Sequence, residues 1–182
     1  MLFPSVLHIG TMKNEISFKN DVLPLKNKLY RLALRITMDT GEAEDVVQDT
    51  LIRVWNKRDE WDELESIEAY CMTICKNLSL DRHEKKDAQN IQLDEALHDS
   101  AEISDNPESS LELKDRVELV HRLINSLPDK QKIAIQLREI EGKNYKDIAD
   151  IMGITEEDVK VSIFRGRQKI KQKFLEFENY GL

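Results

Sequence analysis

Cysteine and glycine are scarce in this chain of 182 residues, and their scarcity excludes several classes of protein. Its two cysteines, Cys71 and Cys75, are too few for the disulfide framework of a small secreted protein, and they lack the further Cys and His ligands of a zinc site. We therefore predict two reduced core cysteines in a cytoplasmic protein. None of the six glycines forms a Gly-rich phosphate loop in residues 20–87.

Long apolar runs are also missing. No segment approaches the roughly 20 apolar residues that span a membrane, which predicts no direct membrane insertion. The first residues, MLFPSVLHIGTM, have no basic region and carry Pro4 within a short apolar run, so they differ from a signal peptide. Met12 is a second candidate start.

Catalytic side chains do not cluster along the sequence. No Ser, Cys or carboxylate lies at nucleophile or metal-ligand spacing from the four scattered histidines, which are His8, His83, His98 and His121. We therefore expect no enzymatic activity, no metal and no cofactor.

The charge is uneven and suggests where domains end. The formal net charge is -8, yet residues 88–115 hold eight acidic residues and one lysine. This stretch includes DSAEISDNPESS, which has no apolar period and cannot bury enough surface to order itself. We predict an all-α protein in which two small helical domains, residues 20–87 and 113–182, are joined by a flexible acidic linker, residues 88–112, after an N-terminal extension, residues 1–19.

In the first domain, apolar residues at helical spacing predict one helix from Val22 to Ile36 and a second from Ala43 to Trp55, with Trp55 in the buried stripe. The other face of the second helix carries Asp45, Gln48, Asp49 and Ile52. An isoleucine among carboxylates suits a protein partner that offers arginine and an apolar pocket. The alternative is a solvated face with one stray isoleucine.

A third helix is predicted to begin after Ser66 as its N-cap. Its flank presents Thr73, Lys76 and Asn77, and the loop before it carries Trp61. An aromatic ring there could stack on a nucleic-acid base or cap the core, and periodicity does not choose between the two.

The second domain contains the spacing of a helix-turn-helix in YKDIADIMGITEEDV. Ala149 is small where two helices touch, Gly153 allows the turn, and Val159 restarts the core. Thr155 is the expected N-cap of the following helix. That helix should bury one stripe, which comprises Val159, Ile163, Gly166, Ile170, Phe174 and Phe177.

The opposite face of this helix mixes cations with apolar groups, as a partner with both phosphates and methyl groups requires. Its members are Lys160, Val161, Phe164, Arg165, Gln168 and Lys171, and Lys169 adds a further cation. DNA has both features, so this is the predicted DNA-docking surface. A basic amphipathic helix that lies on a membrane or on a protein is the alternative.

Taken together, the two halves resemble the extracytoplasmic-function (ECF) branch of bacterial sigma factors, which has regions 2 and 4 only. GEAEDVVQDTLIRVW is similar to the polymerase-binding segment of region 2, and AYCMTICKNLSLDRHEKK to the helix that contacts the minus-ten element. The segment from LPDKQKIAI to SIFRGRQKI is similar to region 4, which contacts the minus-thirty-five element. The resemblance runs from about residue 20 to 174.

The resemblance implies a sigma factor that binds core RNA polymerase and directs initiation at specific promoters. It places Asp45, Gln48, Asp49 and Ile52 against the polymerase clamp helices and assigns Lys160, Phe164 and Arg165 to the minus-thirty-five groove. The minus-ten set is Trp61, Thr73, Lys76 and Asn77, with Asn77 at a flipped base. Val161 and Ser162 depart from the usual family residues, Ser and a cation. A membrane-anchored anti-sigma factor is the expected further partner.

A stand-alone helix-turn-helix regulator with an N-terminal sensing or dimerisation domain is the main rival function. That interpretation leaves the face of Asp45, Gln48 and Asp49 without a use. Binding to core RNA polymerase distinguishes the two, because only a sigma factor has it.

Overall fold

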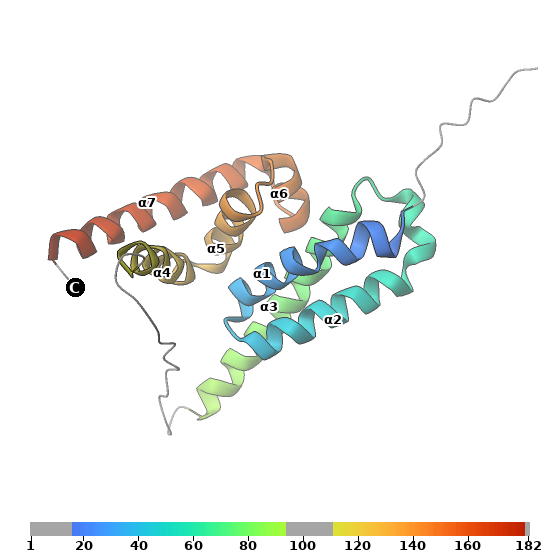
Figure 1. The fold of residues 1–182 in the computed structure, drawn as a ribbon, viewed down its shortest axis with the longest axis horizontal. Helices are drawn as coiled ribbons and strands as arrows, with labels where there is room; N and C mark the ends of the chain where they lie inside the picture. Colours follow the sequence, from blue (N-terminus) through green and yellow to red (C-terminus); the bar gives the residue numbers. More distant parts are fainter. Residues whose placement is uncertain (1–15, 94–110, 181–182) are drawn as a thin grey trace, which may run out of the picture.

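The computed structural model describes residues 16–93 and 111–180, and all regular structure within these ranges is helical (Figure 1). The predicted all-α fold is therefore confirmed. The first half contains the short π- and 3-10 turns Phe18–Val22, Leu23–Leu25 and Arg58–Glu63 around α1 (Lys26–Thr37), α2 (Thr40–Asn56) and α3 (Ile67–Leu93). The second contains α4 (Leu111–Asn125), α5 (Asp129–Ile135), a π turn at Gln136–Ile140, α6 (Tyr145–Met152) and α7 (Glu156–Tyr180).

Local capping sets where the first-half helices begin. Met38 takes a left-handed conformation that ends α1, and the side chain of Asp39 accepts from the backbone N–H of Glu42 at 3.0 Å to start α2. Ser66 caps α3 as predicted, because its hydroxyl accepts from the N–H of Ala69 at 3.2 Å. These three helices pack on one another around fully buried side chains that include Leu29, Leu32, Ile36, Val46 and Met72.

Helix α3 extends into residues that the charge pattern assigned to the linker. Helix α3 continues to Leu93, six residues beyond the expected domain end at residue 87. Helix α4 begins at Leu111, two residues before the predicted end of the linker. Residues 94–110, and residues 1–15 of the N-terminal extension, lie outside the described residues. The flexibility expected of the linker therefore stays a prediction.

The predicted helix-turn-helix is formed by α6 and α7. Gly153 ends α6 with φ 66° and Ile154 N–H donates to the carbonyl of Ala149 at 3.1 Å, a turn that a residue with a side chain would strain. Thr155 then caps α7, accepting from the N–H of Asp158 at 3.1 Å. Gly166 lets α7 approach α5, since a Cβ there would lie 2.9 Å from Cγ1 of Ile135.

The buried stripe of α7 is shorter than predicted. Val159, Ile163 and Gly166 are buried, whereas Phe177 is 41% exposed. Phe177 lies in the last turn of α7, at the far end of this half in Figure 1.

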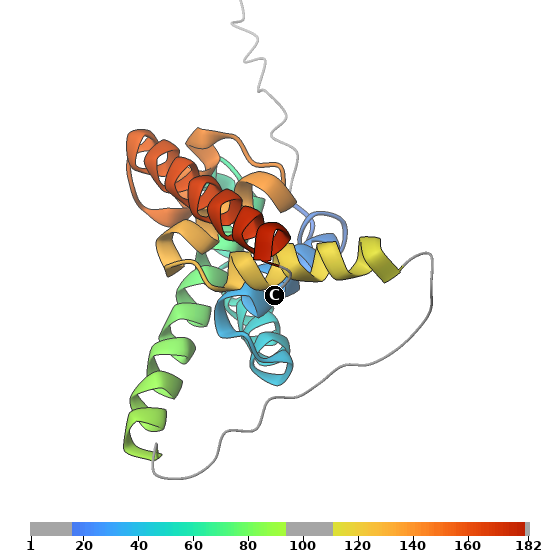
Figure 2. The same cartoon turned by 90° about the vertical axis from the view of Figure 1, so that its left-hand side faces the viewer.

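The two halves lie in contact, with α3 against α6 and α1 against α5 (Figure 2). Arg31 of α1 forms a two-pronged ion pair with Glu141, through N–O distances of 2.9 and 2.6 Å. Glu68 of α3 bridges Lys28 at 2.7 Å and Lys143 at 2.6 Å. Burial alone would raise the pKa of Glu68, but its bonds to the two lysines outweigh burial and lower it. A polar seam therefore joins the halves.

Within the described ranges, no helix has the length and apolar character needed to cross a membrane.

Candidate protein and nucleic-acid interfaces

The face of α2 predicted to meet a protein is presented to solvent. Asp45, Gln48 and Ile52 are exposed and Asp49 is half-buried, and Ile52 retains 57% of its accessible surface. The four residues occupy positions i, i+3, i+4 and i+7, so they share one side of the helix.

Sequence reasoning missed one member of this surface. Trp55, expected in the buried stripe, is 46% exposed and lines a shallow apolar hollow with Phe18, Leu51 and Ile52. Phe18 lies edge-on to Trp55 and parallel to Trp61, at centroid distances of 5.1 and 6.4 Å. Of the two tryptophans, Trp61 is the one in the core, with 5% of its surface exposed. No spacing in the sequence shows which of two nearby tryptophans is inside.

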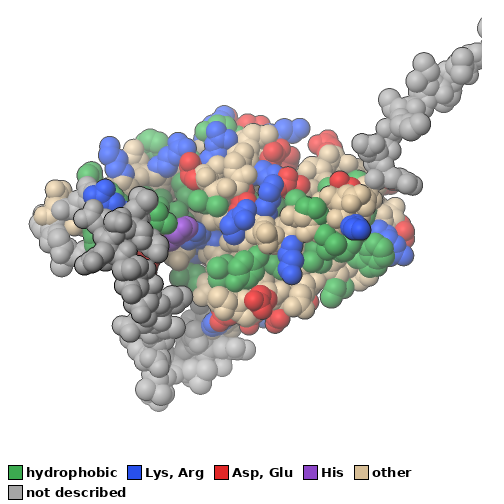
Figure 3. All heavy atoms as spheres, in the orientation of Figure 1, with side chains coloured by type: hydrophobic (Ala, Val, Ile, Leu, Met, Phe, Trp, Pro, Cys, Tyr) green, Lys and Arg blue, Asp and Glu red, His purple; other side chains and the backbone are tan. Residues whose placement is uncertain are grey.

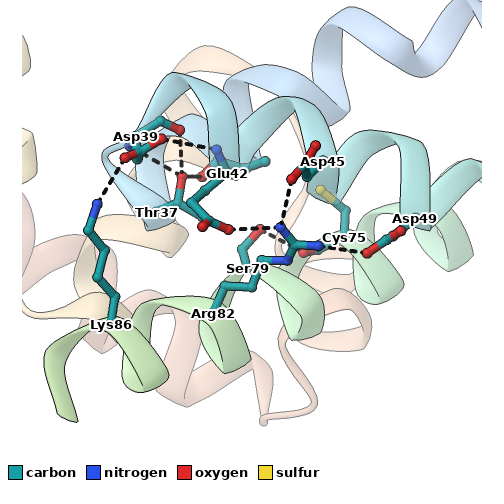
Figure 4. A network of polar contacts seen from close by, with 10 residues as sticks. Thr37, Asp39, Glu42, Asp45, Asp49, Cys75, Ser79, Arg82 and Lys86 are labelled. Atoms are coloured by element: carbon teal, nitrogen blue, oxygen red, sulfur yellow. Dashed lines mark hydrogen bonds and ion pairs between the residues drawn. The ribbon is translucent and has the colours of Figure 1, made fainter. Parts of the chain in front are cut away.

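The acidic side of this face is joined to α3 by ion pairs (Figure 4). Arg82 bonds to Glu42, Asp45 and Asp49, and one turn later Lys86 bonds to Asp39 at 2.9 Å. The Glu42 amide, and then Lys86, lower the pKa of Asp39. Sequence reasoning did not identify this pairing, because it depends on how α2 and α3 pack.

Of the four residues predicted at the minus-ten element, Asn77 alone is exposed. Thr73 is half-buried, and its hydroxyl donates to the carbonyl of Ala69 at 2.8 Å. Lys76 is 9% exposed, since α6 covers it and its ammonium donates to the carbonyl of Met152 at 3.5 Å. This burial lowers the pKa of Lys76.

Trp61 is buried rather than available to DNA. The prediction that it contacts DNA does not fit this structure, because the side chain is 5% exposed and its indole N–H donates to the carbonyl of Val54 at 3.2 Å. A ring held in the core has no free face on which a base can stack. The alternative that the sequence left open, a tryptophan that caps the core, is the one observed.

All seven residues predicted on the DNA-docking face of α7 are exposed. They are Lys160, Val161, Phe164, Arg165, Gln168, Lys169 and Lys171. Phe164 is 63% exposed, although a phenyl ring normally gains by burial. Lys and Arg side chains follow the upper edge of the molecule in Figure 3, where Figure 1 places α7.

Two nearby side chains do not belong to this face. Ser162 is buried and its hydroxyl donates to the carbonyl of Asp158 at 2.6 Å, so of the two residues that depart from the family pattern this one does not face the DNA-docking side. Arg167 lies on another side of α7 and bonds to Glu139, which separates it from Arg165.

The acidic first turn of α7 is partly neutralised. Asp158 lies 3.8 Å from the ammonium of Lys130, and Glu157 lies 3.5 Å from that of Lys160. Lys160 is also 5.8 Å from the ring centroid of Tyr145 in α6. Carboxylates near a phosphate backbone are repelled, and these lysines reduce that repulsion.

Comparison with known proteins finds two family models that match this chain in order. The model for sigma-70 region 2 matches residues 22–89, and that for sigma-70 region 4 matches residues 118–170. The RNA polymerase sigma-H factor of Pseudomonas aeruginosa is 31% identical over 162 residues, covering 82% of this chain and 81% of that protein. The relatives of this chain also include ECF sigma factors of Bacillus subtilis. The chain belongs to the ECF group of sigma factors. Its function is to direct the initiation of transcription.

Two further relatives agree with this assignment. The ECF sigma factor SigW of Bacillus subtilis is 28% identical over 156 residues, covering 81% of this sigma factor and 83% of SigW. The sigma factor RpoE from Bartonella quintana, solved in complex with the anti-sigma factor NepR, superposes with a TM-score of 0.70 at 28% identity. That alignment covers 85% of this chain and 94% of RpoE.

Proposed function

We propose that this sigma factor docks on core RNA polymerase through the face of α2 and contacts promoter DNA through α3 and α7. Residues 20–87 then act as region 2 and residues 113–182 as region 4. The observation that carries the proposal is the division of α7 into two sides. Gly166 on one side meets Ile135 closely, while Phe164 and Arg165 on the other extend into solvent.

The polymerase face combines charge with apolar surface. Asp45 and Asp49 supply carboxylates, and the hollow around Ile52 and Trp55 lies along the same helix. A partner helix with arginine and leucine side chains is complementary to both features. Exposed carboxylates favour encounter with such a basic partner and fix its orientation.

The α7 face suits the major groove at the minus-thirty-five element. The guanidinium of Arg165 can donate two hydrogen bonds, one to O6 and one to N7 of guanine, and the ring of Phe164 can pack against a thymine methyl group. The lysines at 160, 169 and 171 suit phosphates, which any sequence offers. Val161 lies beside Phe164 and extends the apolar part of the face.

The minus-ten contact rests on Asn77. Its exposed amide offers both a donor and an acceptor, which can pair with the edge of a base that melted DNA exposes. Lys76 is under α6 here, so its proposed contact with DNA requires α6 to separate from α3. Trp61 is not part of the proposed contact.

An anti-sigma factor is the further proposed partner, since the related RpoE is described in complex with one. Such a protein would compete for the surfaces that polymerase and DNA use. The membrane anchor expected of that protein stays a prediction.

The test is reconstitution with core RNA polymerase from the source organism. The full chain should bind core enzyme and support transcription from a promoter that core enzyme alone does not use. Changing Phe164 and Arg165 to alanine together should abolish that transcription while leaving core binding within twofold. A chain that binds DNA specifically but never binds core enzyme would instead support the stand-alone regulator.

A further inference from the structure

We propose that Arg82 of α3 is a positioning residue of the polymerase-docking face: it holds the carboxylates of Asp45 and Asp49 in place on α2. The inference rests on the proposed docking of α2 and adds a residue from a different helix to it. Arg82 itself lies at the edge of the face, with 27% of its side chain exposed.

Figure 4 shows the Arg82 side chain reaching from α3 to three carboxylates on one edge of α2. Nη1 lies 2.8 Å from Oε2 of Glu42 and 3.5 Å from Oδ2 of Asp45, and Nη2 lies 2.7 Å from Oδ2 of Asp49. Because a guanidinium is planar and carries five N–H donors, one arginine can hold several acceptors in fixed directions.

The three carboxylates need such a cation. Positions 42, 45 and 49 follow one another at i, i+3 and i+7, so their side chains share an edge and repel. The single positive charge of Arg82 offsets this repulsion while the cluster keeps a net negative charge for a basic partner. The bonds to Glu42, and then to Asp49, raise the pKa of Arg82, and burial opposes that rise.

The two aspartates remain available to a partner while Arg82 holds them. Both bonds use Oδ2, and the side chains of Asp45 and Asp49 are 65% and 45% exposed. A donor from polymerase can therefore approach each carboxylate from the solvent side. A side chain that is already fixed loses less conformational freedom on binding, so positioning increases affinity.

The positioning role predicts the direction in which affinity for polymerase changes when Arg82 is removed. If charge alone decided, removing Arg82 would make the face more negative and strengthen its attraction for a basic partner. If Arg82 positions the aspartates, the same removal weakens binding although the attraction between net charges rises. The two accounts therefore predict opposite changes in the dissociation constant.

The experiment measures the dissociation constant of the full chain for core RNA polymerase at several salt concentrations. Arg82→Met keeps much of the aliphatic stem but removes the charge, and we expect binding to weaken about threefold to tenfold, in the lower part of the range seen for coupled neighbouring groups. Arg82→Lys keeps a positive charge but lacks the planar guanidinium, so it should recover part of the lost affinity for core enzyme. The matched control is Lys86→Met, which removes an equal charge from the neighbouring pair with Asp39 and should stay within twofold.

A double-mutant cycle separates positioning from general destabilisation. Since Arg82 acts through the carboxylates, Arg82→Met should have a smaller effect on binding in an Asp49→Asn background than in the wild type. A purely structural role would give the same loss in both backgrounds. Equal losses would therefore overturn the proposal, even if Arg82→Met lowers stability.

Two further outcomes distinguish this proposal from the proposed function. If Asp49→Lys and Ile52→Glu both leave core binding unchanged, α2 is not the docking face and the role of Arg82 fails with it. If those two variants weaken binding while Arg82→Met binds as tightly as the wild type or more tightly, the docking face stands and the positioning role of Arg82 is wrong.

Discussion

The guanidinium of Arg35 in α1 donates to Nδ1 of His121 in α4 at 2.8 Å. Arginine has no acceptor, so this nitrogen must be the unprotonated one and the imidazole must be neutral. Arg35 also donates to the side chain of Gln136 at 3.0 Å, and together these bonds link region 2 to region 4.

This pairing predicts a pH-dependent stability. Partial desolvation, and then the charge of Arg35, lower the pKa of His121 below its usual 6.5, although the residue as a whole is exposed. The unfolded chain therefore binds more protons, so the stabilisation is complete above pH 6.5 and is lost as the pH falls through the lower folded value. His121→Asn keeps an acceptor that does not titrate. The urea midpoint should fall less between pH 7.5 and pH 5.5 for this variant than for the wild type. An equal fall in both proteins would contradict the role of His121.

Arg165 should determine base preference at the minus-thirty-five element. We expect Arg165→Ala to cost about 1–3 kcal/mol on the preferred sequence and to relax selection at one position. The measurement is holoenzyme binding to sites selected from a randomised duplex. Arg167→Ala is the matched control, because Arg167 is bonded to Glu139 away from the face. An Arg165→Ala loss that is equal on every sequence would assign Arg165 to phosphates instead.

The lysines of α7 should behave differently from Arg165. Replacing Lys169 or Lys171 with alanine should weaken holoenzyme binding evenly across sequences, because an ammonium neutralises phosphate whatever base is near. The log-log slope of affinity against salt should flatten by about one unit for each lysine that contacts DNA. An unchanged slope would remove that lysine from the interface.

The α2 face should lose affinity for polymerase when its charge or its apolar centre is changed. Asp49→Lys and Ile52→Glu are each expected to cost about 1–3 kcal/mol of core binding if they are central contacts. Glu44→Lys makes the same charge change on α2 beside Tyr30 of α1, and it should have less effect. Circular dichroism checks that each variant is folded, and wild-type affinity in the Asp49→Lys/Ile52→Glu double variant would exclude this face.

Asn77 should act after DNA is bound. Asn77→Ala removes an amide that can pair with an unstacked base, so promoter opening should slow while binding of the minus-thirty-five duplex is unchanged. Permanganate footprinting of the melted region provides the measurement. Equal reactivity in variant and wild type would leave Asn77 as an ordinary surface residue of α3.

The two cysteines should be unreactive in the folded chain. Burial raises the pKa of Cys71 and Cys75 to about 12, from 9.0 in the absence of such burial. The thiolate fraction at neutral pH is therefore lower by about a thousandfold. Iodoacetamide at pH 8, followed by mass spectrometry, should label neither residue until urea unfolds the chain. Rapid labelling of the native chain would show that this part of the core opens.

The repeating patterns of the sequence determined the helices and several of their ends. Apolar spacing predicted helices in both halves, and Ser66, Gly153 and Thr155 marked ends that depend only on neighbouring backbone groups. The exposed face of α7 was predictable for the same reason. Once Val159, Ile163 and Gly166 face the core, helical geometry leaves Phe164 and Arg165 outside.

Tertiary structure alone decided which residues are covered by, or paired with, another helix. Trp55 and Trp61 have the same chemistry and both contact Phe18, yet the first is 46% exposed and the second is 5% exposed. Lys76 lies on a predicted contact surface of α3, yet α6 covers it from more than 60 residues away in sequence. Arg82 joins the α2 face through pairs that span 33 to 40 residues. Periodicity gives the side of a helix on which a residue lies, whereas the element that packs there depends on contacts distant in sequence.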